Sequence, residues 1–421
     1  IAAQSGQTQW ALHPGQAPHA GKTKGVPVLN DLDPFWGSIL DPFAHLPQNA
    51  DEPAKPADVQ QNLTFASLPL TLWGKDLKAV ADKDADPDDD LEDVGRDVAA
   101  ITKTGKPALG FGWYQEGFDR EPADPGPADA EGRHASYITH HNGPQYFGYI
   151  ANNPRMRENL HGLDDFYRDL RNRSLPATGG LVYVKGGYQN IFGLTPANPD
   201  PAVQKNFRGD DDHPAYSDSQ ISEAMVAMTI NRIADSPYWN QCAIIVTWDD
   251  CEGDYDHVPP PIRSVGPDGL PLSDGPRVPL LLVSPYARVH HVAHAVGSHA
   301  SVVKFVDRLF DLIPLAKLPD ELLGRQLGLK QFGQPDLGPA DAITPDVTDL
   351  LDAFDPARLS GVAAPLPKEY VTVPADLVQT LPFTNGYGCK NLGITPVDKK
   401  LNIKNEVPAD FNPRPNTNSS K

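Results

Sequence analysis

The chain has 421 residues, enough for one large domain or two of ordinary size. It carries 55 acidic and 36 basic residues, and the net charge of −19 argues against a general surface for nucleic acids or anionic membranes. The 44 prolines and the hydrophobic content of 39% predict a real core with long Pro-rich loops, and no stretch has the length needed for stable membrane insertion.

Apolar patterning predicts alternating strands and helices through the middle of the chain. In chain order these are a short strand or edge segment at 110–114, a helix at 163–171, a strand at 181–185, a helix at 220–234, strands at 243–248 and 278–285, a helix that starts at 298–301 and a short helix at 347–354. Strand runs rich in β-branched residues are typical of buried strands in a mostly parallel sheet. The alternation predicts an α/β sandwich, and the Pro-rich residues 365–421 predict an extended tail that wraps around it.

A group of charged residues follows the strand at 243–248. Asp249 and Asp250 come directly after it, and Asp256 and His257 come a few residues later. Ligands bind at the carboxyl ends of the strands in open α/β sheets, and two adjacent carboxylates repel each other unless a cation or proton lies between them. We therefore expect a divalent metal or a phosphoester site here. The alternative is a polar strand-to-loop turn, because Asp and Gly favour turns.

Histidines gather in two other places. His140 and His141 are adjacent in a loop that ends in a Pro turn, where both imidazoles can approach one anion. Four more surround the predicted helix start at 298–301, and a helix N-terminus favours anions. These four are His290, His291, His294 and His299. Both groups also fit ordinary solvated or hydrogen-bonded histidines, so the residues alone leave phosphate binding open.

Taken in order, these motifs resemble those of a known family. The matching segments are His140–Asn142, Gln145–Phe147, Leu163–Phe166, Leu175–Pro176, Val184–Lys185, His213–Pro214, Ser217, Ser236–Trp239, Ile244–Asp250, Gly253, Tyr255–Val258, Pro260–Pro261, Arg277–Pro279, Ser284–Ala287, His299 and Ser301. In this order they resemble the bacterial phosphoesterase family that groups non-haemolytic phospholipases C with a set of acid phosphatases. The resemblance runs from Ile1, where Gln4–Trp10 also looks like a family segment, to about Leu312 and more loosely to Pro356.

The resemblance implies an alkaline-phosphatase-like α/β sandwich and a metal-dependent phosphoric ester hydrolase. By resemblance, Asp249 and Asp250 ligate one divalent metal ion, and such an oxygen-rich ligand set suits Ca²⁺, Mg²⁺ or Mn²⁺. The other roles that it implies are catalysis by His140, His141, His213, Asp256 and His257, and substrate binding by Lys185 and His299.

The resemblance also implies a domain organisation. Residues 1–356 correspond to the catalytic domain, and residues 357–421 to a Pro-rich extension packed on it. Family members usually carry a Glu-Asn segment that completes the metal site, and a Ser or Thr nucleophile upstream of the Gln-rich segment seen here at residues 4–9. Neither is found in this sequence. We therefore expect the chain to be the C-terminal part of a family member, with an N-terminal fragment of the same protein as its partner.

The expected reaction is hydrolysis of phosphate esters. The histidine-rich pocket favours phosphomonoesters and an acid optimum, as in an acid phosphatase. A phospholipase C, the first alternative, needs an apolar approach for its lipid, whereas the loops nearest the site are rich in acidic residues. A non-catalytic secreted binding protein on the same fold is the alternative of another class. We expect a periplasmic or secreted location. The three cysteines, Cys242, Cys251 and Cys389, are compatible with one disulfide or with none.

Overall fold

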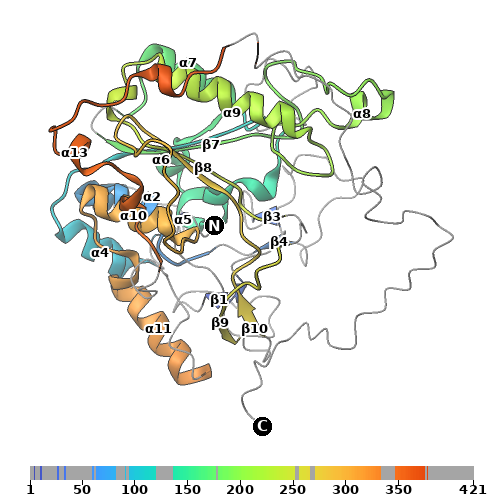
Figure 1. The fold of residues 1–421 in the computed structure, drawn as a ribbon. Coiled ribbons are helices and arrows are strands. Elements are labelled where there is room, and N and C mark those ends of the chain that lie inside the picture. The colour runs from blue at the N-terminus through green and yellow to red at the C-terminus, as the bar shows by residue number, and fades with distance from the viewer. Residues whose placement is uncertain are drawn as a thin grey trace.

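Helices cover both faces of a central sheet (Figure 1). The computed structural model describes residues 63–81, 94–119, 136–176, 179–251, 256–265, 271–332 and 347–374, with isolated residues or pairs at 4, 10–11, 26–27, 33–34, 59–60, 91 and 377. Beyond four two-residue strands near the N-terminus, the strands are β5 (Gly110–Gln115), β6 (Leu160–Gly162), β7 (Gly180–Lys185), β8 (Ile244–Thr247), β9 (Ile262–Val265), β10 (Pro271–Ser273) and β11 (Leu280–Val283). The helices are α2 (Leu68–Leu72), α3 (Leu77–Ala81), α4 (Gly95–Lys103), α5 (Gly148–Ala151), α6 (Pro154–Arg157), α7 (Leu163–Asn172), α8 (Pro201–Asn206), α9 (Ser219–Ala234), α10 (Ala300–Phe310), α11 (Pro319–Phe332) and α13 (Pro356–Leu359).

Three strands form a parallel sheet in the order β6-β5-β7. The segment at 110–114, expected as a short strand or an edge, is the central strand, and it pairs along its whole length with β7. Gln115 lies opposite Lys185, so β5 and β7 end at the same edge of the sheet. Residues that follow these two strands are therefore brought close together.

The two later strands differ from the prediction. β8 and β11 were expected as buried strands of a mostly parallel sheet, but they pair with each other in antiparallel register, with Ile244 opposite Val283. Their burial was also overestimated, because β8 is half-buried and Leu281 of β11 is 53% exposed. The reason is that an apolar, β-branched run fits any strand with one covered face, and it does not specify the direction of its partner.

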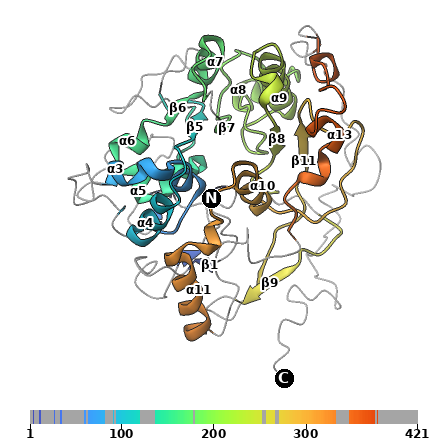
Figure 2. The same ribbon diagram turned by 90° about the vertical axis from the view of Figure 1, so that its left-hand side faces the viewer.

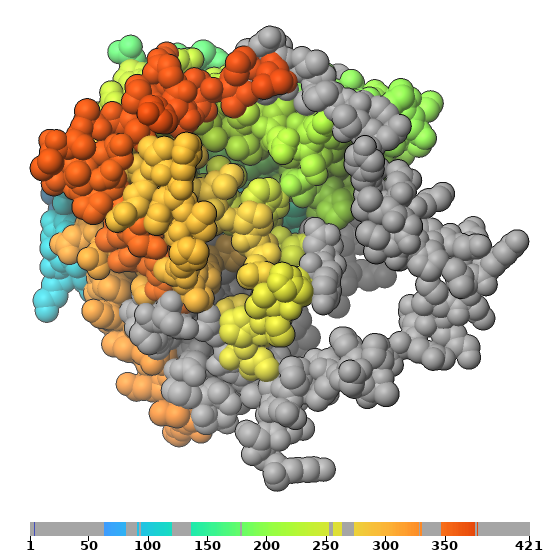
Figure 3. Space-filling view, in the orientation of Figure 1, coloured from blue at the N-terminus to red at the C-terminus, as the bar shows by residue number. Residues whose placement is uncertain are grey.

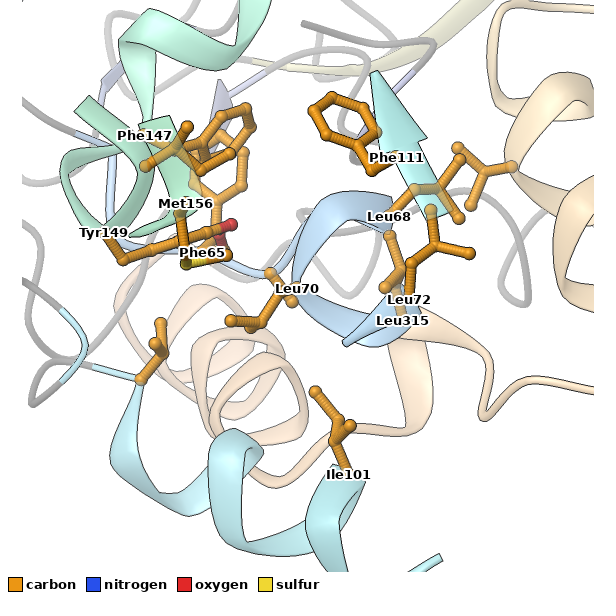
Figure 4. Close-up of a cluster of buried hydrophobic side chains, with 14 of the residues drawn as sticks. Phe65, Leu68, Leu70, Leu72, Ile101, Phe111, Phe147, Tyr149, Met156 and Leu315 are labelled. Atoms are coloured by element: carbon orange, nitrogen blue, oxygen red, sulfur yellow. The ribbon is translucent and has the colours of Figure 1, made fainter. Parts of the chain in front are cut away.

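Alternation along β5 divides the core into two layers. Phe111 and Trp113 belong to a large cluster with Leu68 and Leu72 of α2, part of which Figure 4 shows. Tyr114, the residue after Trp113, belongs to a second cluster, formed mainly by α7. Because successive side chains of a strand point to opposite faces, this division places helices on both sides of the sheet. The predicted α/β sandwich is confirmed.

Outside these layers, α11 projects away from the sheet (Figures 1 and 2). Its first turn is fixed to α4, where the backbone N–H of Asp320 donates to the buried Asp97 over 2.8 Å and Arg96 pairs with the Asp320 carboxylate. No helix among the described residues has the length and apolar character needed to cross a membrane.

Residues 347–374 run over the surface of the sandwich (Figure 3). Trp239 Nε1 donates to the Leu366 carbonyl over 3.2 Å, and Asn231 exchanges two hydrogen bonds with the backbone of Val373. The short helix expected at 347–354 is only a 3-10 turn at Leu351–Ala353. The rest of the predicted tail lies, apart from residue 377, outside the described residues, as does Cys389, whereas Cys242 and Cys251 are free thiols.

Candidate active site

The carboxyl ends of β7 and β8 bring a lysine and two aspartates together. Lys185 Nζ lies 3.4 Å from both carboxylate oxygens of Asp249 and 2.7 Å from Oδ1 of Asp211. Burial alone would lower the pKa of Lys185, but the two carboxylates raise it. In turn, Lys185 holds the pKa of the Asp249 carboxyl well below its usual range. All three groups are therefore charged over the physiological pH range.

Asp211 is the central residue of the buried part of this cluster. Its second oxygen, Oδ2, lies 2.8 Å from Nδ1 of His141 and accepts a hydrogen bond from the Tyr216 hydroxyl over 3.1 Å. Burial would raise the pKa of Asp211, but Lys185 and His141 lower it below its usual value. The sequence analysis did not propose Asp211 as a site residue. The available signal was its position in the acidic run just before His213.

His141 is held in one orientation by this carboxylate. The approach of Oδ2 to within 2.8 Å of Nδ1 favours the neutral tautomer with its proton on that nitrogen, which leaves Nε2 as the acceptor. Burial and the Lys185 charge lower the pKa of His141, although Asp211 opposes them. The ring of His140 meets that of His141 edge-on, with centroids 4.5 Å apart, so the adjacent histidines do lie together.

His213 belongs to the loop that carries Asp211. Its ring stacks on Tyr216 with centroids 4.3 Å apart, and its Nδ1 accepts the backbone N–H of Ala215 over 3.1 Å. The proton of the neutral ring is therefore on Nε2, which makes that nitrogen a hydrogen-bond donor.

Two contacts hold Trp248, the residue directly before Asp249. The Trp248 indole donates to Oδ2 of Asp212 over 2.7 Å, and His299 Nε2 lies 2.8 Å from the Trp248 carbonyl. His299, which was expected to bind substrate, is thus placed where it can fix the end of β8 and the position of Asp249.

The remaining predicted residues lie in more exposed surroundings. Asp250 is exposed, and His257 is 81% exposed at 3.8 Å from Asp256. Asp256 binds the Arg277 guanidinium through both oxygens, at 2.7 and 2.8 Å. Within the described residues, no hydrogen bond or ion pair connects Asp256 or His257 with the cluster around Asp211.

A second group of ligand-type side chains lies where β5 and β6 end and α7 begins. One ligand atom each from Asp119, His161 and Asp165 lies within 4.8 Å of the others, so this triad could hold a metal ion. Burial and the neighbouring Asp119 raise the pKa of Asp165 to about 6, and Arg168 forms an ion pair with it. The sequence analysis did not single out the triad, since its members come from three separate segments.

Comparison with known proteins identifies the family. The model of the Phosphoesterase family matches residues 103–313, about half of the chain, and this range includes every candidate residue described above. Over 124 residues the chain is 32% identical to non-specific phospholipase C1 of Arabidopsis thaliana, covering 25% of this chain and 23% of that protein. It is 29% identical over 116 residues to hemolytic phospholipase C of Pseudomonas aeruginosa, covering 24% and 15%, and 27% identical over 145 residues to phospholipase C B of Mycobacterium tuberculosis, covering 30% and 28%. The chain thus spans less than a third of the length of each of these relatives.

Proposed function

Because this chain belongs to the phosphoesterase family, we propose that it hydrolyses phosphate esters at the carboxyl ends of β7 and β8. The observation that supports this site is the contact of Lys185 with both Asp211 and Asp249. A phosphoryl group placed here meets an ammonium and several imidazoles, which stabilise the charge on its oxygens. It also meets exposed carboxylates that can bind a cation.

A divalent cation would be held by Asp249 and Asp250. Asp249 fits this role because its side chain is 66% exposed and its carboxyl stays ionised, and Asp250 is exposed beside it. A pair of carboxylates suits Ca²⁺, Mg²⁺ or Mn²⁺. When bound, such a cation polarises a phosphoryl oxygen. The triad of Asp119, His161 and Asp165 is the rival position for a metal ion.

The other residues of the site bind the ester and move protons. Asp211 orients His141, whose Nε2 can accept or donate a proton, in the manner of a histidine held by a carboxylate. His213 donates from Nε2 to a phosphoryl oxygen, and His140 adds a second imidazole beside His141. The places of Asp256 and His257 in the catalytic set rest on the family motif Tyr255–Val258.

Phosphomonoesters are the first candidate substrates. A monoester carries up to two charges on its terminal oxygens, and Lys185 with the three histidines provides cationic and hydrogen-bonding groups for them. Protonation of His141 requires acid, because burial lowers the pKa of its imidazole. An acid phosphatase is therefore the activity that we propose first.

Phospholipase C activity is the second candidate. The relatives named above are phospholipases C, and apolar side chains are exposed on β11 and in the loop before α10. The most exposed are Leu281 (53%), Val292 (70%) and Val296 (55%). Such side chains can contact an acyl chain, so the exposed surface is not purely polar and also suits a lipid substrate.

The test is to assay the native protein on a soluble phosphomonoester and on phosphatidylcholine vesicles from about pH 4 to about pH 9. Preference for the monoester with an acid optimum supports the first candidate, and preference for the lipid supports the second. No hydrolysis of either ester would favour the non-catalytic binding protein.

Variants then locate the site and its metal. We expect Lys185→Met to abolish hydrolysis while Lys205→Met, on an exposed face of α8, retains it. The metal content of two further variants is then measured. If Asp249→Asn loses the metal and His161→Ala keeps it, the cation is bound by Asp249 and Asp250. The reverse result assigns the cation to the triad.

A further inference from the structure

Two buried carboxyl groups next to the candidate site have no role in the proposed mechanism. Glu116 follows β5 and is 1% exposed, and Asp210 precedes Asp211 and is 2% exposed. Their side chains lie within hydrogen-bonding reach of each other. An ionised carboxylate can only accept hydrogen bonds, so a hydrogen bond between the two groups requires a proton on one of them.

Close backbone packing holds both carboxyls in place. Oδ1 of Asp210 accepts the backbone N–H of Gly187 over 3.0 Å. A Cβ atom added at Gly186 would lie 2.4 Å from the same oxygen, and one added at Gly187 would lie 3.1 Å from Cβ of Glu116. These two glycines follow β7 directly, so the pair lies between the ends of β5 and β7 and the loop that carries Asp211.

The surroundings of the pair favour retention of the proton. Among the described residues, the titratable groups around it include Asp211 on the same loop and Tyr167 of α7, which has Arg232 of α9 beside it. Asp211 adds a negative charge, whereas the Arg232 guanidinium lies over the Tyr167 ring, 4.2 Å from its centroid. Burial and then Asp211 raise the pKa of Asp210 to about 7, although the hydrogen bonds from Gly187 and Glu116 oppose the rise.

We propose that Glu116 and Asp210 share one proton and that the protonated pair positions Asp211 for its contacts with His141 and Lys185. The shared proton is a property of the fold, whereas its effect on catalysis rests on the proposed function. When the proton leaves, the two buried carboxylates repel each other. Because Asp210 is directly followed by Asp211, the loop that carries both residues must then shift. The pair thus limits the working arrangement of the site to acidic and neutral pH.

The proton itself can be detected without any assay of activity. Infrared titration of the wild-type protein should show a carboxyl C=O band that persists above the usual aspartate range and disappears as the pH rises through about 7. The band should be reduced in Asp210→Asn and Glu116→Gln and unchanged in Asp200→Asn, a matched change at an exposed carboxylate. Asp97 and Asp165, whose pKa values are also raised, to about 7 and about 6, account for the part of the band that both variants retain. An unchanged band in both variants overturns the proposal.

The positioning role is tested by the pH profile of kcat/KM. Asparagine at 210 or glutamine at 116 supplies a permanent N–H donor in place of the shared proton. We expect the alkaline loss of activity to shift to higher pH in both variants and to stay at its wild-type position in Asp200→Asn. An equal loss at all pH values in both variants would indicate a merely structural role and overturn the positioning claim. If the native protein hydrolyses no ester, the proposed function fails, while the infrared titration still decides whether the proton is shared.

Discussion

At the residue scale, Asp211 is the side chain on which the proposed mechanism depends most. Asp211→Asn keeps the shape but removes the charge that holds Lys185 and fixes the proton of His141 on Nδ1. We expect kcat to fall by about 10²–10⁴-fold, the usual contribution of a positioned acid–base group. Asp200→Asn is the control, and steady-state kinetics is the measurement. Activity within about twofold of wild type would remove His141 from the proton-transfer role.

Sequence reasoning selected some residues that the structure brings together, but not the residues that connect them. Lys185 and Asp249 were proposed from the motifs, and the structure places them in contact. Asp211 and the Glu116–Asp210 pair were not proposed from the sequence, because their importance comes from burial and from contacts between loops that follow different strands. Such contacts depend on the order of strands in the sheet, which no local pattern contains.

At the scale of elements, periodicity located most of the longer elements between residues 110 and 310, but neither their pairing nor α4 and α11 outside that range. The predicted helices at 163–171 and 220–234 correspond to α7 and α9, because apolar patterning and a capping Asp218 are local signals. The antiparallel pairing of β8 with β11 and the half-exposed state of β8 were missed. Both depend on which distant segment lies beside a strand.

A prediction at this scale concerns the segment after α13. Asn231 of α9 accepts the N–H of Val373 over 2.9 Å and donates to its carbonyl over 2.7 Å. Asn231→Ala removes both bonds, each contributing about 1 kcal/mol, so the segment should detach more often. Limited proteolysis should then cleave near 368–374 faster than in wild type. Asn206→Ala at the exposed end of α8 should cleave at the wild-type rate; equal rates in both variants would show that these bonds do not hold the segment.

For the whole molecule, the distribution of buried carboxyls determines how stability depends on pH. Burial raises the pKa of Asp97 to about 7, and burial and a neighbouring aspartate raise those of Asp165 and Asp210 to about 6 and about 7. A carboxyl whose folded-state pKa is raised binds its proton more tightly in the native state. Its contribution to stability is complete below the unfolded pKa of about 4 and is lost as the pH rises through the folded value. The net charge of −19 at pH 7 adds self-repulsion in the same direction.

Two histidines act in the opposite direction, because burial lowers the pKa of His141 and of His161. Their contribution to the free energy of unfolding is present at higher pH and is lost as the pH falls below about 6.5. Since three raised carboxyls oppose two histidines, we expect the free energy of unfolding to be higher at about pH 5 than at about pH 7.5. Thermal unfolding at the two pH values measures this difference. Replacing the three aspartates together by asparagine should remove most of it, whereas the same change at three exposed aspartates, Asp76, Asp200 and Asp235, should leave it intact. A wild-type protein that is more stable at pH 7.5 would contradict the expectation, because the histidines would then outweigh the buried acids.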